Sequence, residues 1–253
     1  LRPLGLRLLP GEDVKENVIR DTIVSAHSGN KEYVSSKFVE CTEAENGALQ
    51  KIEFKNEDKF NFAFDIVDEI AKKDPEKLAM LHIDKNKVER RFTFNDMKRA
   101  SNQCANYFKS LGIKKGDRVM LVLKRHYQFW FAMLGLNKLG AVAIPATNQL
   151  QEHDFEYRYN AAGVKAILCT ADGDTAHQAE MAARNAPTLE TRILVGGSRE
   201  GWRDFDAELS AYSVEYPRGE DAPGDKGGVE LGIAGTERDV GDGATVCLRG
   251  AVE

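Results

Sequence analysis

Residues 111–147 read LGIKKGDRVMLVLKRHYQFWFAMLGLNKLGAVAIPAT, and this stretch decides the fold of the chain. Residues 118–123 are apolar on both faces, as a parallel strand must be when helices cover both sides of its sheet. Apolar side chains then recur at three- and four-residue spacing over residues 127–134, which predicts an amphipathic helix. Gly140 ends that helix, and residues 141–144 form a second short strand. The stretch is therefore predicted to be one β-α-β unit.

The same alternation continues toward the C-terminus. The pattern predicts a helix over 152–160, a strand over 165–170, a helix over 174–185 and a strand over 191–195. A closing amphipathic segment follows to about residue 216. Because right-handed crossovers place helices on both faces, the fold class is predicted to be α/β, with a doubly wound, mostly parallel sheet flanked by helices.

Toward the N-terminus, a helical stripe of apolar residues covers 64–71. Residues 78–83 and 88–94 are rich in β-forming side chains and enclose a polar turn, which predicts a hairpin. Thr93 and Asp96 then have the spacing of a capping box at the start of a long helix.

The two ends of the chain have a different character. Residues 1–54 receive no fold assignment, and a weak pattern at 13–27 fits either a short helix or a strand. Residues 224–253 contain eight glycines and no aromatic side chain. Such a segment buries too little surface to offset its ordering entropy, so both tails are predicted to be poorly packed or disordered.

Composition excludes several classes of protein. The chain has 253 residues and a formal net charge of -5, so it lacks the basic surface of a nucleic-acid-binding protein. No apolar run approaches the roughly 18 residues of a membrane span. The four cysteines are scattered without a C-x-x-C pair, as expected of reduced thiols in a cytoplasmic protein, and no histidine spacing suggests a metal site. We expect Cys104 to be a core residue.

In a doubly wound sheet, ligands bind outside the carboxyl ends of the strands. This rule selects residues 124–126 (Lys-Arg-His) and 145–147 (Pro-Ala-Thr). A cationic loop there suits a phosphate or carboxylate, but the residues by themselves favour a solvated loop that starts a helix. Arg125 and Thr147 are therefore the candidate cofactor-binding residues. No catalytic residue and no metal ligand is predicted, and the Gly-Gly-Ser sequence at 196–198 fits a plain turn.

Several stretches in register resemble a known family. Residues 60–81 and 90–147 are similar to the N-terminal part of AMP-forming acyl-CoA synthetases, members of the adenylate-forming superfamily. Residues 92–100 resemble the first core motif of that family, T-[YF]-x-x-[LM]. Residues 139–147 (LGAVAIPAT) resemble the second, L-x-A-G-A-x-x-x-P. Residues 193–209 are typical of the acetate and medium-chain branch.

The resemblance covers residues 55–222 and implies the N-terminal subdomain of the adenylate-forming fold. It also implies a two-step reaction, in which ATP and a short- or medium-chain carboxylate form an acyl-adenylate and CoA then displaces AMP. ATP, CoA and Mg²⁺ are implied as substrates and metal. The family binds phosphates with a Ser/Thr/Gly-rich loop ending in Pro-Lys, expected shortly after Glu220. It also uses a ribose-binding Asp and a Lys on a mobile C-terminal domain.

Residues 223–253 depart from this pattern, since no such loop occurs in them. The chain is therefore interpreted as a truncated or frameshifted synthetase product that does not adenylate a substrate alone. The alternatives are a divergent natural tail, or a non-catalytic module that binds CoA or an acyl ligand or pairs with a separately encoded remainder of the synthetase. An unrelated nucleotide-binding domain is disfavoured by the missing glycine fingerprint. The nucleotide sequence downstream distinguishes truncation from a natural tail.

Overall fold

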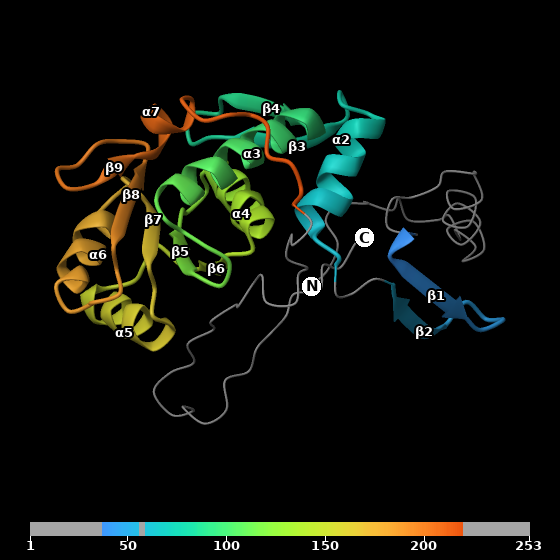
Figure 1. Cartoon of the computed structure of the whole chain (residues 1–253), viewed down its shortest axis with the longest axis horizontal. Helices are drawn as coiled ribbons and strands as arrows, with labels where there is room; N and C mark the ends of the chain where they lie inside the picture. The colour runs from blue at the N-terminus through green and yellow to red at the C-terminus, as the bar shows by residue number, and fades with distance from the viewer. Residues whose placement is uncertain (1–36, 56–58, 220–253) are drawn as a thin grey trace, which may run out of the picture.

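A five-stranded parallel sheet forms the centre of the chain in the computed structural model, which describes residues 37–55 and 59–219 (Figure 1). The strands follow the order β6-β5-β7-β8-β9, and every neighbouring pair is parallel. They are β5 (Arg118–Val122), β6 (Val142–Pro145), β7 (Ala166–Thr170), β8 (Thr191–Val195) and β9 (Arg203–Asp204). The predicted α/β fold class and mostly parallel sheet are confirmed.

Helices cover both faces of this sheet (Figure 1). On one face lie α3 (Phe94–Ser110) and α4 (Gln128–Leu139), and on the other lie α5 (Glu152–Ala162) and α6 (Thr175–Ala183). Strand β5 serves both cores, because Val119 and Leu121 face the first pair of helices while Met120 and Val122 face the second. This two-sided burial is why residues 118–123 carry no polar alternation.

Helix α3 starts and helix α4 ends at the residues that local signals in the sequence predict. Thr93 Oγ1 accepts a hydrogen bond from the backbone N–H of Asp96 at 3.1 Å, and Asp96 Oδ2 accepts one from the backbone N–H of Thr93 at 2.8 Å. The predicted capping box is therefore confirmed at the start of α3. Gly140 has a φ of 74°, a left-handed conformation that favours glycine at a helix C-terminus.

The N-terminal helical stripe is confirmed with one difference. Its first part, η2 (Ala63–Asp68), is wound as a π-helix, and only α2 (Glu69–Lys73) has α-helical geometry. The spacing of apolar residues does not distinguish the two, because both winding patterns keep one face apolar. The predicted hairpin is also confirmed, as the antiparallel pair β3 (Leu78–Ile83) and β4 (Glu89–Thr93).

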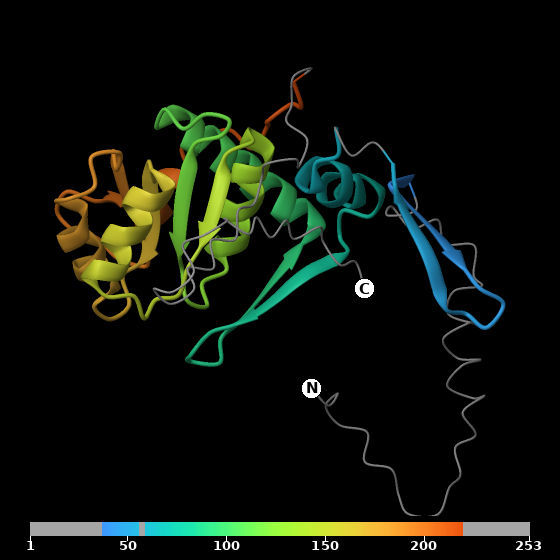
Figure 2. The same ribbon diagram turned by 90° about the horizontal axis from the view of Figure 1, so that it is seen from below.

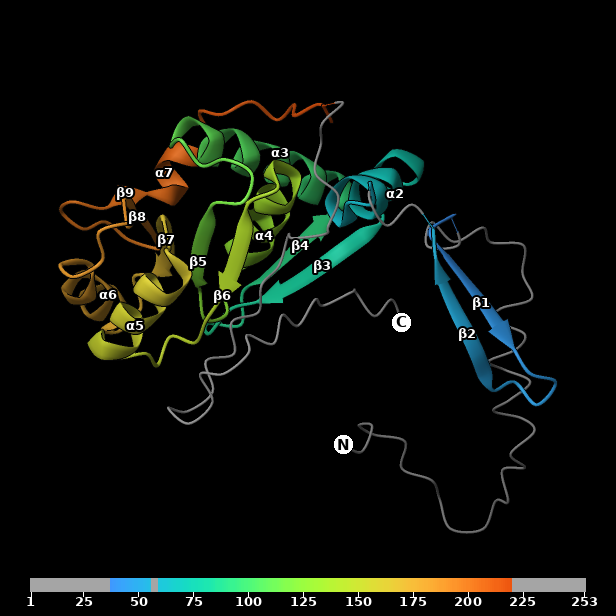
Figure 3. The ribbon, with the colours of Figure 1, turned by 60° about the horizontal axis from the view of Figure 1, so that its bottom comes forward.

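The sequence patterns do not predict the first two strands of the described chain. Within residues 1–54, to which no fold was assigned, β1 (Val39–Glu43) and β2 (Leu49–Phe54) form an antiparallel hairpin. The hairpin stands away from the central sheet (Figures 2 and 3), and the side chains of Ile52 and Phe54 remain exposed. A strand without a buried face gives only a weak hydrophobic pattern, which explains the omission.

The closing segment also differs from a simple amphipathic stretch. It forms the two-residue edge strand β9 followed by the short helix α7 (Phe205–Leu209), whose Phe205 is buried in the core beneath α3. The weak pattern at 13–27 and the glycine-rich residues 224–253 lie outside the described residues. Within the part of the chain that the structure describes, no helix is long and apolar enough to span a membrane.

Candidate functional site

The carboxyl edge of the sheet has a topological switch point between β5 and β7. The chain leaves β5 into α4 on one face of the sheet and leaves β7 into α6 on the other face. The two connections therefore diverge to opposite faces of the sheet at the neighbouring ends of β5 and β7. Ligands of doubly wound proteins bind at such points.

Both predicted cofactor-binding residues lie at this edge. Arg125 follows β5 and is exposed, and its carbonyl oxygen accepts a hydrogen bond from His82 Nε2 at 2.9 Å. Thr147 follows β6, the neighbouring strand, and its Oγ1 accepts a hydrogen bond from the backbone N–H of Gln149 at 3.3 Å. Their role in cofactor binding stays a prediction.

His126, the third residue of the cationic loop, contacts the end of β7. Its Nε2 lies 2.7 Å from Thr170 Oγ1 at the end of β7 and 3.7 Å from Asp172 Oδ2 in the next loop. The Thr170 hydroxyl also accepts a hydrogen bond from the backbone N–H of Asp172 at 3.0 Å. Burial lowers the pKa of His126 below its usual value, although the carboxylates of Asp172 and Asp206 act in the opposite direction. The imidazole is therefore neutral at neutral pH.

Asp206 joins two further segments at the same edge. Its Oδ1 accepts a hydrogen bond from Gln128 Nε2 at 2.8 Å, and its Oδ2 accepts one from the backbone N–H of Gly196 at 2.9 Å. Gly196 has a φ of 80°, and a Cβ atom there would lie 3.5 Å from His126 Cε1. The turn at 196–198 thus lies beside the His126 ring with its first N–H already bonded, in agreement with the interpretation as a plain turn.

The cationic loop predicted from the sequence includes His126, but the sequence does not indicate which side chains contact it. Thr170, Asp172 and Asp206 follow it by 44 or more positions and carry no motif of their own. These residues meet because their strands lie near one another in the sheet. Predicting the contact would have required the strand order β6-β5-β7-β8-β9.

The two described buried cysteines are not reactive groups. Burial raises the pKa of the Cys169 thiol to about 12 and raises that of Cys104 strongly as well. Both thiols are therefore protonated at neutral pH and cannot act as thiolate nucleophiles. Cys104 is fully buried, which confirms it as a core residue.

The described residues also contain no group of three or more side chains arranged to hold a metal ion. The Mg²⁺ implied by the family resemblance therefore has no fitting carboxylate set within residues 37–55 and 59–219.

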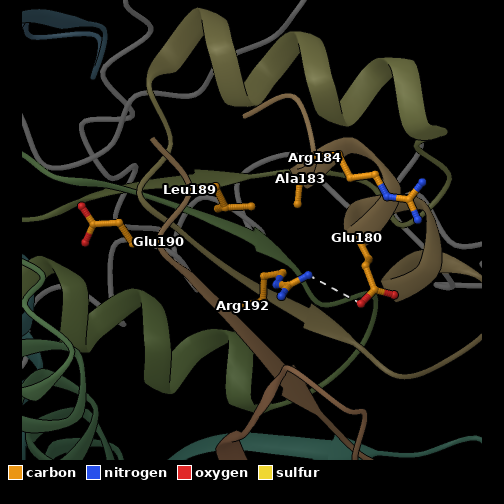
Figure 4. Close-up of a pocket in the computed structure, with 6 residues that line it drawn as sticks. All are labelled: Glu180, Ala183, Arg184, Leu189, Glu190 and Arg192. Carbon is orange, nitrogen blue, oxygen red and sulfur yellow. Dashed lines mark ion pairs between the residues drawn. The ribbon is translucent and has the colours of Figure 1, made fainter. Parts of the chain in front are cut away.

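A hollow of about 360 Å³ lies away from the carboxyl edge, beside the start of β8. Figure 4 shows Arg192 facing Glu180, with Glu190 turned away on the other side. Arg192 Nη1 lies 3.5 Å from Glu180 Oε1, and Arg199 Nη2 lies 2.5 Å from Glu180 Oε2. The hydrogen bond from Arg199 lowers the pKa of Glu180. Two guanidinium groups therefore neutralise the Glu180 carboxylate, and Glu190 Oε2 lies 3.9 Å from Lys165 Nζ.

Comparison with known proteins identifies the family. The family model of the AMP-binding enzymes matches residues 67–226, which include the whole five-stranded sheet. The chain belongs to the AMP-binding enzyme family. Acyl-coenzyme A synthetase ACSM5, mitochondrial, of Rattus norvegicus is 34% identical to this chain over 164 residues. The resemblance to AMP-forming acyl-CoA synthetases is therefore confirmed.

Solved structures support the fold of the chain. A crystal structure of Brucella canis acyl-CoA synthetase superposes with a TM-score of 0.60 at 20% identity, covering 72% of this chain and 33% of that chain. The N-terminal domain of FACL13 from Mycobacterium tuberculosis, in an inhibitor-bound crystal structure, superposes with a TM-score of 0.53 at 24% identity, covering 64% and 38%. The match to the rat synthetase covers 62% of this chain and 28% of the relative. The matched part of the chain thus spans less than a third of the length of this curated relative.

Proposed function

We propose that this chain supplies the N-terminal subdomain of an AMP-forming acyl-CoA synthetase. The proposed reaction is the ATP-dependent adenylation of a short- or medium-chain carboxylate, followed by transfer of the acyl group to CoA. One observation carries the proposal: the family match at residues 67–226 coincides with a doubly wound sheet that has a cationic loop at its carboxyl edge.

The loop after β5 is the part of this edge best suited to an anionic ligand. Lys124 and Arg125 are exposed and directly precede α4, a helix of 12 residues. Their charges add to the partial positive charge of the helix N-terminus, so the loop suits a phosphate group of ATP or CoA. Thr147, after the neighbouring strand, belongs to the same proposed site, because a hydroxyl can donate a hydrogen bond to a phosphate oxygen. The described residues offer no fitting set of ligands for Mg²⁺.

The proposal includes a truncated or frameshifted origin of residues 223–253. The 253 residues contain no Pro-Lys pair, so the phosphate loop expected from the family does not occur among them. We propose that these residues do not adenylate a carboxylate without that loop and the catalytic Lys of the family. Residence in the cytoplasm belongs to the same proposal, and subcellular fractionation tests it.

An exchange assay tests the catalytic half of the proposal. The purified 253-residue chain, given ATP, labelled pyrophosphate and acetate or octanoate, is expected to show no acid-dependent exchange of label into ATP. An intact acyl-CoA synthetase serves as the positive control. Turnover by the chain alone would show that its own residues suffice for adenylation and would contradict this part of the proposal.

A binding experiment tests the role of the cationic loop. Isothermal titration calorimetry with CoA is expected to show binding that Arg125→Ala weakens by about tenfold, since loss of one charge-assisted contact is worth roughly 1.4 kcal/mol. Arg99→Ala, which removes an exposed guanidinium on α3, is the matched control. Equal affinities of the two variants would remove Arg125 from the proposed site.

A further inference from the structure

A hydrogen bond joins the β3–β4 hairpin to the cationic loop after β5. The donor is His82 Nε2 on β3, and the acceptor is the carbonyl oxygen of Arg125, 2.9 Å away and 43 positions further along the chain. Because a carbonyl oxygen only accepts, the ring proton of His82 lies on Nε2. The hairpin, which is not a strand of the central sheet, thus contacts the backbone of a residue proposed to hold an anionic ligand.

Aromatic contacts hold the His82 ring at this position. The ring meets Tyr127 edge-on, with 5.3 Å between the ring centroids, and Phe92 on β4 lies 4.9 Å from the same tyrosine ring. Arg90, the partner of His82 across the hairpin, has its guanidinium carbon 5.9 Å from the Tyr127 centroid. Since Tyr127 directly follows the cationic loop, the hairpin packs against the loop and against the start of α4.

The cationic loop lies in a turn that needs support from outside. The backbone N–H of His126 donates to the carbonyl of Leu123 at 2.9 Å, which closes a turn over residues 123–126. Lys124 in this turn has a φ of 36°, a left-handed conformation that is strained for a residue with a side chain. Such a conformation persists where the surrounding contacts enforce it. The next residue is Arg125, whose carbonyl receives the hydrogen bond from the hairpin.

We propose that His82 is a positioning residue, which fixes the turn at 123–126 and thereby the direction in which Arg125 presents its guanidinium group to an anionic ligand. The peptide unit is planar, so holding the carbonyl of Arg125 also fixes the backbone from which its side chain projects. A cation ordered in advance binds a phosphate group with a smaller entropy cost. This role rests on the proposed function, in which Arg125 contacts a phosphate of ATP or CoA.

The second ring nitrogen separates a positioning role from a purely structural one. Nδ1 of His82 is buried and has no hydrogen-bond partner among the described residues. His82→Phe keeps an aromatic ring against Tyr127 and removes this unsatisfied acceptor along with the donor. The carbonyl of Arg125 can then bond to water, because Arg125 is exposed. The urea midpoint of His82→Phe is therefore expected to equal or exceed that of the wild type.

Amide hydrogen exchange of the full chain without ligand tests whether His82 holds the turn. Protection of the His126 amide is expected to fall by about tenfold in His82→Phe, the effect of about one lost hydrogen bond, while protection of Leu121 in β5 stays unchanged. His82→Gln is expected to restore most of the protection, because its side-chain amide can donate to the same carbonyl. The ¹³C resonance of the Arg125 carbonyl is expected to shift in His82→Phe and to return in His82→Gln.

Asp84→Ala is the matched control for a general loosening of the hairpin. It removes the two 2.9 Å hydrogen bonds from the backbone N–H groups of Asn86 and Val88, and it does not touch the turn at 123–126. Equal protection of the His126 amide in His82→Phe and the wild type would overturn the proposal, and so would an equal loss in Asp84→Ala. If His82→Phe fails to fold, ¹⁵N spectra of the wild-type ring decide, since a proton on Nδ1 instead of Nε2 would overturn it.

Calorimetric titration with CoA tests the link to Arg125. His82→Phe is expected to weaken binding by up to about tenfold, and His82→Phe/Arg125→Ala is expected to bind no more weakly than Arg125→Ala alone, because His82 acts through Arg125. Additive losses would overturn that link. Absence of CoA binding by the wild type would contradict the proposed function, whereas the exchange and ¹³C measurements decide the hold on the turn without any ligand.

Discussion

Lys138 is the most deeply buried charged residue that the structure describes. It lies near the end of α4 with its side chain fully buried. Its Nζ donates hydrogen bonds to Asp68 Oδ1 at 2.8 Å, to Asp68 Oδ2 at 2.9 Å and to Asn102 Oδ1 at 2.7 Å. It also lies 5.2 Å from the ring centroid of Phe64. One ammonium group thus joins η2, α3 and α4.

Replacing Lys138 by Met is expected to lower the free energy of unfolding by about 3–5 kcal/mol, because it leaves the Asp68 carboxylate buried without a counter-charge. Urea denaturation measures the change. The double variant Lys138→Met/Asp68→Asn is the control, since it removes both charges and is expected to recover part of the loss. Equal stabilities of the single and double variants would show that the ion pair is not what holds η2 in place.

Asp117 serves a similar purpose at the amino edge of the sheet. Burial acts to raise the pKa of its carboxyl group, but hydrogen bonds from Lys165 Nζ (2.9 Å) and from the backbone N–H of Lys114 (2.8 Å) outweigh burial and hold the pKa below its usual value. Lys165 Nζ also donates to the carbonyl of Gly112 at 2.9 Å. The turn before β5 is thus tied to the start of β7.

The lowered pKa of Asp117 determines how its contribution depends on pH. A carboxyl group with a depressed folded-state pKa stabilises the fold above its unfolded pKa of about 3.9, and this contribution is lost as pH falls through the folded value. Asp117→Asn is therefore expected to lower stability by about 1 kcal/mol at pH 7. The difference from the wild type should shrink as pH falls through the folded-state pKa, which lies below its usual value. Thermal unfolding followed from pH 7 to pH 2.5 measures it, and a difference as large at pH 2.5 as at pH 7 would contradict this account.

At the scale of secondary-structure elements, the packing of α3 on α4 depends on Gly135. A Cβ atom at this position would lie 2.5 Å from Cys104 Cβ, 2.9 Å from the backbone nitrogen of Ala105 and 3.0 Å from the carbonyl oxygen of Ser101. Two of these three atoms belong to the backbone of α3 and cannot turn aside. The absence of a side chain therefore sets the distance between the two helices.

Gly135→Ala is expected to destabilise the protein by about 1–3 kcal/mol through overpacking, although alanine favours a helix more than glycine does. Gly219→Ala is the control, because a Cβ atom there meets nothing within 4 Å. Chemical denaturation of both variants against the wild type measures the effect. A neutral or stabilised Gly135→Ala would mean that α3 and α4 move apart freely.

At the scale of the whole molecule, one sheet connects the two hydrophobic cores. Strands β5, β7 and β8 send alternate side chains into the core under α3 and α4 and into the core under α5 and α6. The two tryptophans of the chain report on opposite faces, since Trp130 lies on α4 and Trp202 packs in the second core. The cores are therefore expected to unfold together.

Single-tryptophan variants test this cooperativity. Fluorescence-detected urea unfolding of Trp130→Phe and of Trp202→Phe is expected to give the midpoint that circular dichroism gives for the same variant, because neither core can lose its sheet alone. The absolute midpoints of the two variants differ by the cost of each substitution, so the comparison is made within each variant. Fluorescence and circular dichroism midpoints that separate would show two independent folding units.

The amino-acid sequence determined most of the architecture through local physics. Apolar runs on both faces specified the parallel strands, three- and four-residue spacing specified α3 to α6, and Thr93, Asp96 and Gly140 specified helix ends. The motifs at 92–100 and 139–147 also specified the family that the match at 67–226 confirmed. These features were accessible because each depends on residues close together in the chain.

Only the tertiary structure decided which distant side chains meet. Strand order places the end of β5 beside the end of β7, and this brings His126 to Thr170 and Asp172 although no motif joins them. The same is true of Lys138 and Asp68, which are 70 positions apart. The physical reason is that helix and strand patterns depend on which face is buried, whereas hydrogen bonds and ion pairs depend on distances that only the packed sheet sets.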